Sequence, residues 1–178
     1  MVLVLLADGF EEIEALTPID VLRRAGLTVK SCGLFGSEVR GSHGIYVKAD
    51  TSPEEVNPDE IDMLILPGGM PGATNIDAHP YTDIFIDAVR KNGGRLAAIC
   101  AAPLVLGRRG LLDGRKACCY PGFEDELRGA TISDMGVVTD GNITTARGMG
   151  VALEFAKELV RLCLGEDKAN AISASIME

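Results

Sequence analysis

Residues 95–103 read RLAAICAAP, and this stretch decides the expected fold. The apolar run Leu96–Ile99 follows the turn-forming residues 92–94 and predicts a short buried strand. A helix is predicted from Ala101 onward, so Cys100 falls at the join. Unpaired N–H groups and the dipole at a helix N-terminus lower the pKa of a thiol. We therefore expect Cys100 to be a nucleophile, with the N–H of Ala101 as an oxyanion donor.

The alternative is that Cys100 merely ends a core strand, because free cysteine is among the most buried residue types. The chain has five cysteines, which cannot all pair with one another, and their spacing fits no zinc pattern. We therefore expect free thiols, a reducing cytoplasmic setting and no metal site. Cys32 and Cys163 are interpreted as core residues. Cys119, at the end of a short strand together with Cys118, is a candidate to face the pocket.

The composition favours one domain spanning residues 1–178, with 47% hydrophobic and 24% charged residues. A net charge of −9 argues against nucleic acids and anionic membranes as partners. No apolar run reaches the length of a membrane span. The apolar segment Val2–Leu6 lacks a basic flank and a cleavage site, so it predicts a strand rather than a signal peptide.

Strands and helices alternate along the chain, which predicts a mostly parallel sheet covered on both faces. The expected strands are 2–6, 27–34, 63–66, 96–99 and 116–119, with an antiparallel element at 41–47 and a hairpin at 136–146. The expected helices are 11–25, 80–92, 101–109, 149–164 and 166–175. Pro18 predicts that the first helix kinks or begins late, because its ring crowds the preceding turn.

Three candidate segments lie at or after the carboxyl ends of predicted strands: 7–14, 67–72 and Cys100. In such sheets the binding site lies beyond these ends, so we expect the three to converge on one pocket. Glu14 precedes an apolar stretch; a partly buried carboxyl there has a raised pKa and can move protons. The alternative is a third solvated glutamate beside Glu11 and Glu12, which are expected to favour the helix dipole from solvent.

The pair Gly68–Gly69 is either a simple turn or a tight turn that aims backbone N–H groups at a developing negative charge. Neither a Walker loop nor a dinucleotide fingerprint is present. The chain has two histidines, and none follows His79, so a late histidine for a Cys-His-acid triad is missing. His43 lies in a loop and reaches a pocket only across some distance or a dimer interface. Arg147 either binds an anion or forms a structural ion pair.

Together these features resemble the ThiJ/PfpI family, in the branch of the Parkinson-disease-associated protein deglycase and its bacterial relatives. The resemblance covers essentially the whole chain. Its most specific motifs are GFEEIE at 9–14, PIDVLRRAG at 18–26, LPGG at 66–69, AAICAAP at 97–103 and TARG at 145–148.

The resemblance implies a flavodoxin-like three-layer α/β sandwich that dimerises, often through the first helix. It implies that Cys100 is a reactive thiol at a nucleophile elbow and that Glu14 is its protonated partner. Gly69 and Ala101 supply backbone N–H groups. Gly68, Tyr120, Cys119, His43 and Arg147 are the further candidates for the pocket.

The activity implied is cofactor-free: a glyoxalase or deglycase reaction on small 2-oxoaldehydes or their glycation adducts. The alternative is a redox-sensing, chaperone-like stress protein whose cysteine is oxidised to the sulfinate. Peptidases of another branch have a histidine directly after the cysteine, where this chain has Ala101. Some relatives carry His-Pro where this chain has Tyr120–Pro121, which argues further against a peptidase or amidase.

Overall fold

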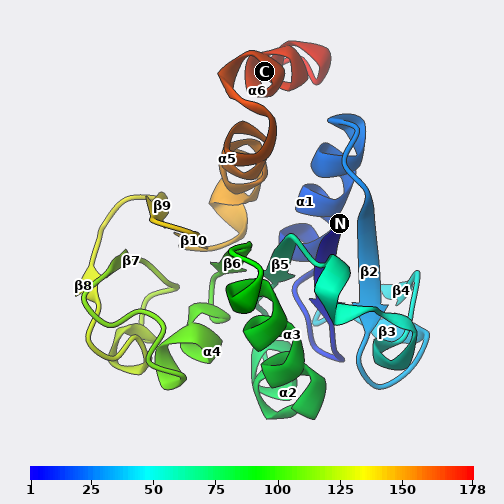
Figure 1. The fold of residues 1–178 in the computed structure, drawn as a ribbon, viewed down its shortest axis with the longest axis vertical. Coiled ribbons are helices and arrows are strands. Elements are labelled where there is room, and N and C mark those ends of the chain that lie inside the picture. Colours follow the sequence, from blue (N-terminus) through cyan, green and yellow to red (C-terminus); the bar gives the residue numbers. More distant parts are fainter.

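The computed structural model describes residues 1–178 and shows an α/β fold of three layers around one mixed sheet (Figure 1). The strand order is β2-β1-β5-β6-β10-β9, and only β9 runs antiparallel to its neighbour. The bounds are β1 (Val2–Leu6), β2 (Val29–Gly33), β5 (Met63–Leu66), β6 (Arg95–Ile99), β9 (Val137–Asp140) and β10 (Ile143–Ala146). The parallel strands follow the flavodoxin-like order, which confirms the predicted fold class.

Helices cover both faces of this sheet. One face packs against α1 (Glu12–Arg24) and α5 (Ala152–Leu164), with α6 (Glu166–Ser175) behind α5. The other face packs against α2 (Gly72–Ala78), α3 (Pro80–Lys91) and α4 (Pro103–Arg108). Figure 1 shows α5 and α6 above the strands and α2, α3 and α4 below them.

The continuous apolar run of β1 follows from this double cover. Val2, Val4 and Leu6 pack with α1 and α5, whereas Leu3 and Leu5 pack with α2, α3 and α4. A central parallel strand is buried on both faces, so neither set of alternate side chains is polar.

The smaller elements differ most from expectation. The predicted strand at 41–47 is instead mostly the turn between β3 (Glu38–Arg40) and β4 (Tyr46–Lys48). The predicted strand 116–119 forms only β7 (Lys116–Ala117), which pairs with β8 (Thr131–Ile132) outside the main sheet. Helix α2 was not predicted. Four 3₁₀ turns complete the chain: η1 (Pro53–Glu55), η2 (Pro58–Glu60), η3 (Glu124–Glu126) and η4 (Met149–Val151).

Two helix starts have a direct physical cause. Helix α1 begins at Glu12 and continues through Pro18, so the predicted late start is wrong. The side chain of Glu11 caps it by accepting the N–H of Glu14 at 2.7 Å. Helix α4 begins at Pro103 rather than Ala101, because proline suits the first helical position. The longest helices have 13 residues, and none has the length and apolar character needed to cross a membrane.

Candidate active site

Cys100 lies on a strained turn between β6 and α4. Its φ is 65°, in the left-handed region that side chains other than glycine rarely adopt. The turn is held on both sides, because Cys100 N–H donates to the carbonyl of Ala146 and Tyr120 N–H donates to the carbonyl of Cys100, each at 2.8 Å. The residue is half-buried, so its thiol remains within reach of small molecules. Strain of this kind concentrates at functional sites.

Glu14 approaches Cys100 from α1. The residue is 1% exposed, so the alternative of a solvated first-turn glutamate is wrong. Its carboxyl accepts the N–H of Gly68 at 3.0 Å and lies close enough to the Cys100 thiol and to the N–H of Met149 for both to lower its pKa. The contribution of Met149 was not predicted, since a backbone N–H leaves no mark in the sequence.

Gly68 lets the loop after β5 pass against both of these side chains, and Gly69 packs against the backbone of residues 9–11. A Cβ on Gly68 would lie 2.5 Å from the Glu14 carboxyl and 2.7 Å from the Cys100 Cβ. Gly69 has a φ of +86°, which glycine adopts at no steric cost. The N–H groups of Gly69 and Ala101 lie near the Cys100 sulfur and favour its ionised form. The expected convergence of the three segments is therefore present in the structure.

The protonation of the pair differs from expectation. Burial raises the pKa of Glu14 to about 7, against the hydrogen bonds from Cys100 and the backbone. The pKa of the Cys100 thiol is raised to about 12, first by burial and then by the Glu14 carboxylate, against the N–H groups of Gly69 and Ala101. The prediction that the pKa of the Cys100 thiol is lowered is therefore wrong when Glu14 is ionised. Because α4 begins only at Pro103, the sulfur does not lie at a helix N-terminus.

The two groups share protons rather than titrating separately. Protonation of Glu14 removes the carboxylate that disfavours the thiolate and turns Glu14 into a hydrogen-bond donor to sulfur. A thiolate at Cys100 therefore forms together with a protonated Glu14. With a pKa of about 7, Glu14 changes protonation state close to neutrality.

Tyr120 and Arg147 line a cavity of about 390 Å³, which neither Cys100 nor Glu14 lines. The Tyr120 ring borders Gly148, and a Cβ at Gly148 would lie 3.9 Å from the Glu14 carboxyl. Arg147 donates to the carbonyl of Asp134 at 3.4 Å and has no carboxylate within ion-pair distance. The structural ion pair considered for Arg147 is therefore absent.

The other cysteines do not join this site. Cys119 is 4% exposed and packs in the core on the α2, α3 and α4 face, so its predicted place in the pocket is wrong. The short strand β7 before it pairs with β8 outside the main sheet, so the predicted strand does not deliver Cys119 to the carboxyl edge of the main sheet. Cys118 is buried with its thiol against the carbonyl of Thr145 at 3.4 Å. Cys32 is buried as expected, but Cys163 is exposed.

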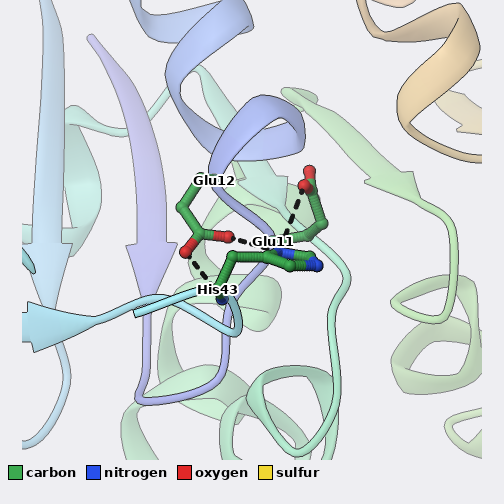
Figure 2. A group of neighbouring side chains, drawn as sticks. All are labelled: Glu11, Glu12 and His43. Atoms are coloured by element: carbon green, nitrogen blue, oxygen red, sulfur yellow. Dashed lines mark hydrogen bonds and ion pairs between the residues drawn. The ribbon is translucent and has the colours of Figure 1, made fainter. Parts of the chain in front are cut away.

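His43 lies at the start of α1 rather than at Cys100 (Figure 2). Its Nδ1 is 3.1 Å from a carboxylate oxygen of Glu12 and 4.0 Å from one of Glu11. Both glutamates are buried, at 8% exposed for Glu11 and 5% for Glu12, so their expected solvation is wrong. These three side chains are the group in the structure with the donor types and spacing to hold a metal ion.

Comparison with known proteins finds relatives of this chain in both sequence and structure. The model of the DJ-1/PfpI family matches residues 1–162. The chain is 36% identical to Protein dj-1beta of Drosophila melanogaster, over 98% of this chain and 95% of that protein. It is 34% identical to Deglycase PfpI of Pyrococcus furiosus, over 90% of this chain and 98% of that protein. The structure of Toxoplasma gondii DJ-1, oxidized, matches with a TM-score of 0.94 and 36% identity, over 99% of this chain and 97% of that one.

Proposed function

Because the chain belongs to the DJ-1/PfpI family, we propose that it is a cofactor-independent enzyme that uses Cys100 to convert small 2-oxoaldehydes or their glycation adducts. The observation that supports this most is the contact of one half-buried thiol with a buried carboxyl and two backbone N–H donors. The relative from Pyrococcus furiosus is named a deglycase, which favours the same class of reaction.

The reaction begins with addition of the Cys100 sulfur to the aldehyde carbon of the substrate. As the C–S bond forms, Glu14 takes the thiol proton, because its carboxyl is the titratable group that lies next to the thiol and its pKa of about 7 suits proton transfer near neutrality. The aldehyde oxygen becomes an oxyanion next to the N–H groups of Gly69 and Ala101, which face the sulfur. Glu14 then passes this proton to the oxyanion, which gives a neutral hemithioacetal and restores the Glu14 carboxylate.

The hemithioacetal then rearranges. The Glu14 carboxylate removes the proton from the former aldehyde carbon, and the hydroxyl proton on that carbon passes to the neighbouring ketone oxygen, which gives an enediol intermediate. Glu14 then delivers its proton to the former ketone carbon, which gives the thioester of a 2-hydroxy acid. Water hydrolyses the thioester, so the 2-hydroxy acid leaves and the thiol is restored. The net reaction adds one water to the 2-oxoaldehyde and needs neither an oxidant nor a cofactor.

The test measures lactate formed from methylglyoxal. We expect Cys100→Ser to lose the activity and Glu14→Gln to lower it by about 10²-fold or more, because proton transfer by a positioned group contributes this much. Cys163→Ser is the matched control, since that thiol is exposed and outside the site, and it should react like the wild type. Equal rates for the wild type, Cys100→Ser and Glu14→Gln would refute the proposal.

A redox-sensing role is the second candidate. The relative from Toxoplasma gondii was solved in an oxidized form, and the donors around Cys100 suit the oxygens of a sulfinate. Mass spectrometry after mild peroxide treatment separates the two roles. Selective addition of two oxygens to Cys100 without aldehyde turnover supports the sensor, whereas turnover without that selectivity supports the enzyme.

We also propose a homodimer that forms through α1. Ile13 on this helix is 44% exposed, and Leu16, Leu153 and Ile176 border an open hollow beside it. An apolar surface of this kind is typical of an interface. Light scattering should give a dimer for the wild type and a monomer for Ile13→Lys, and a monomeric wild type would contradict the proposal.

A further inference from the structure

Glu11 caps the start of α1, three residues before Glu14, and the proposed reaction gives it no part. We propose, resting on the proposed function, that Glu11 is a positioning residue for Glu14. Its carboxylate fixes the backbone that carries Glu14, and its negative charge favours the retention of a proton by the pair of Glu14 and Cys100. Glu11 thus acts through Glu14 rather than on the substrate.

A closed ring of three hydrogen bonds joins Glu11, Gly68 and Glu14. The N–H of Glu11 donates to the carbonyl of Gly68 at 2.9 Å, and the N–H of Gly68 donates to the Glu14 carboxyl at 3.0 Å. The N–H of Glu14 donates to the Glu11 carboxylate at 2.7 Å and closes the ring. Only this last bond uses the side chain of Glu11, so it is the bond that a substitution at residue 11 can remove.

The backbone of Glu11 also supports the loop that carries Gly69. A Cβ on Gly69 would overlap the backbone nitrogen of Glu11, so the two residues are in close contact. The N–H of Gly69 lies near the Cys100 sulfur, where the proposed reaction places the oxyanion. Glu11 therefore contacts both the residue that moves the proton and the loop that carries one oxyanion donor.

The charge of Glu11 acts directly on Glu14. Burial raises the pKa of Glu14 most, and the negative charge of Glu11 raises it further, against the Cys100 thiol and the backbone donors. Glu11 is only 8% exposed, so solvent screens this repulsion weakly. No lysine or arginine forms an ion pair with Glu11 that would cancel its charge.

Glu12 and His43 are the other titratable groups at the start of α1. His43 Nδ1 lies 4.0 Å from a carboxylate oxygen of Glu11 but 3.1 Å from one of Glu12, and Figure 2 shows the two carboxyl groups on different sides of the imidazole. Glu12 also accepts the N–H of His43 at 2.8 Å. Because residues two apart on a helix do not face each other, Glu12 is directed away from Glu14.

Around Glu14 itself, Cys100 is the titratable group that approaches from the turn after β6. The ring of Tyr120 borders Gly148, which adjoins the Glu14 carboxyl. The loop after β5 and the turn η4 present backbone N–H groups to Glu14. Glu11 is therefore the carboxylate whose charge bears on the pair of Glu14 and Cys100.

The sign of the effect does not depend on which member of the pair is ionised. Loss of one proton takes the pair of Glu14 and Cys100 from neutral to a single negative charge, whichever group carries it. The charge of Glu11 opposes this loss, so its removal moves the loss to lower pH. The reactive thiolate belongs to the state after this loss, so the pH dependence of Cys100 reactivity reports on Glu11.

The test measures the rate at which iodoacetamide alkylates Cys100 at pH values around 7, with peptide mass spectrometry to locate the adduct. Iodoacetamide is uncharged, so a change of charge at residue 11 does not attract or repel it. Glu11→Gln keeps an oxygen acceptor for the N–H of Glu14 and removes the charge. We expect it to lower the midpoint of the pH profile by about half a pH unit or more. Glu11→Asp keeps the charge and a preferred cap, so its midpoint should stay near that of the wild type.

Glu12→Gln is the matched control, because it removes the same charge from the adjacent residue and should move the midpoint much less. Glu11→Ser is an uncharged and preferred cap, and it gives a second measurement if Glu11→Gln does not fold. Circular dichroism checks the fold of each variant. The role of Glu11 is overturned if the uncharged variants leave the midpoint unchanged, or if Glu12→Gln moves it equally.

Lactate formation from methylglyoxal separates this role from the proposed function. The pH of half-maximal activity in Glu11→Gln should move together with the alkylation midpoint, and Glu11→Ala, which also removes the cap, should lower the maximal rate as well. A shifted alkylation midpoint in a protein whose wild type forms no lactate refutes the proposed function but not the effect of Glu11 on Cys100. Lactate formation with an unshifted midpoint refutes the role of Glu11 alone.

Discussion

Two groups of acidic side chains lie on opposite faces of the sheet and are neutralised in different ways. Glu11, Glu12 and Glu14 surround the start of α1, where their partners are backbone N–H groups, His43 and the Cys100 thiol. The acidic residues near α4 instead form ion pairs with arginine. The carboxylates near α4 stabilise the fold through ion pairs, whereas among those at the start of α1 Glu14 can change its protonation state near neutral pH.

The arginine-paired group is built around Asp77. Its two oxygens lie 2.7 Å from Arg108 and 2.5 Å from Arg109. Arg108 also contacts Glu126 at 2.6 Å, and Arg109 contacts Asp83 at 2.6 Å. These pairs tie α2, α3 and η3 to α4, so their effect is structural.

The two groups shift carboxyl pKa values in opposite directions. The Arg108 guanidinium lowers the pKa of Glu126, whereas burial without a cation raises the pKa of Glu14 to about 7. Groups whose pKa is moved toward neutrality are typical of functional sites. The absence of arginine around Glu14 is thus what leaves this carboxyl able to exchange a proton with Cys100.

The largest loss of stability is expected from a substitution at Gly68, because its backbone packs directly against Glu14 and Cys100. Gly68→Ala places a Cβ against both the Glu14 carboxyl and Cys100, so either the loop moves or a hydrogen bond is lost. We expect the free energy of unfolding to fall by about 3 kcal/mol, measured with urea. Gly150→Ala is the control, because a Cβ there meets no atom within 4 Å. Equal effects of the two substitutions would show that the site tolerates backbone movement.

Glu14→Gln should have the next largest effect, and it should depend on pH. The folded-state pKa of Glu14 is raised from 4.5 to about 7, so the stability that its protonated form contributes is present below pH 4.5 and lost as pH rises through 7. The difference between these two pKa values corresponds to a change in the free energy of unfolding of roughly 3 kcal/mol at most. Glutamine carries no charge to bury, so Glu14→Gln should be about 2 kcal/mol more stable than the wild type at pH 8 and similar to it at pH 4.

Urea unfolding of both proteins at the two pH values measures this difference. Glu126→Gln serves as the comparison, because its pKa shift has the opposite sign and the substitution should not stabilise the protein at pH 8. A Glu14→Gln protein that is less stable than the wild type at pH 8 would mean that the carboxylate is well accommodated there. The distinction between the two acidic groups would then fail.

Much of the fold could be predicted from the sequence, because the apolar strands and the amphipathic α3 and α5 are local patterns. The position of Cys100 followed from the junction in RLAAICAAP for the same reason. The start of α4 could not be predicted as well, because Ala101 suits both a turn and a helix. The turn is held by hydrogen bonds of Cys100 with Ala146 and Tyr120, which are far away in the sequence.

The burial of Glu11 and Glu12 could not be predicted, because both look like solvated residues of a first helical turn, whereas the apolar stretch after Glu14 set that residue apart. The burial of these glutamates depends on segments far away in the chain: the loop with His43 covers Glu12, and Gly68 meets Glu14. The mistaken place of Cys119 has a similar cause, since the short β7 leaves the main sheet.

The smallest loss of stability is expected from substitutions of the acidic residues that pair with arginine. Asp77→Asn keeps an oxygen acceptor for Arg109 but removes the charge shared by Arg108 and Arg109, whose side chains are 35% and 20% exposed. We expect a loss of about 1 kcal/mol in the free energy of unfolding, because partly exposed ion pairs contribute little. The loss should be the same at pH 6 and pH 8, since neither guanidinium titrates there. Asp83→Asn should cost less, because its side chain is 64% exposed. A loss that changes between pH 6 and pH 8, as that of Glu14 is expected to do, would show that arginine pairing does not fix the protonation of its partners.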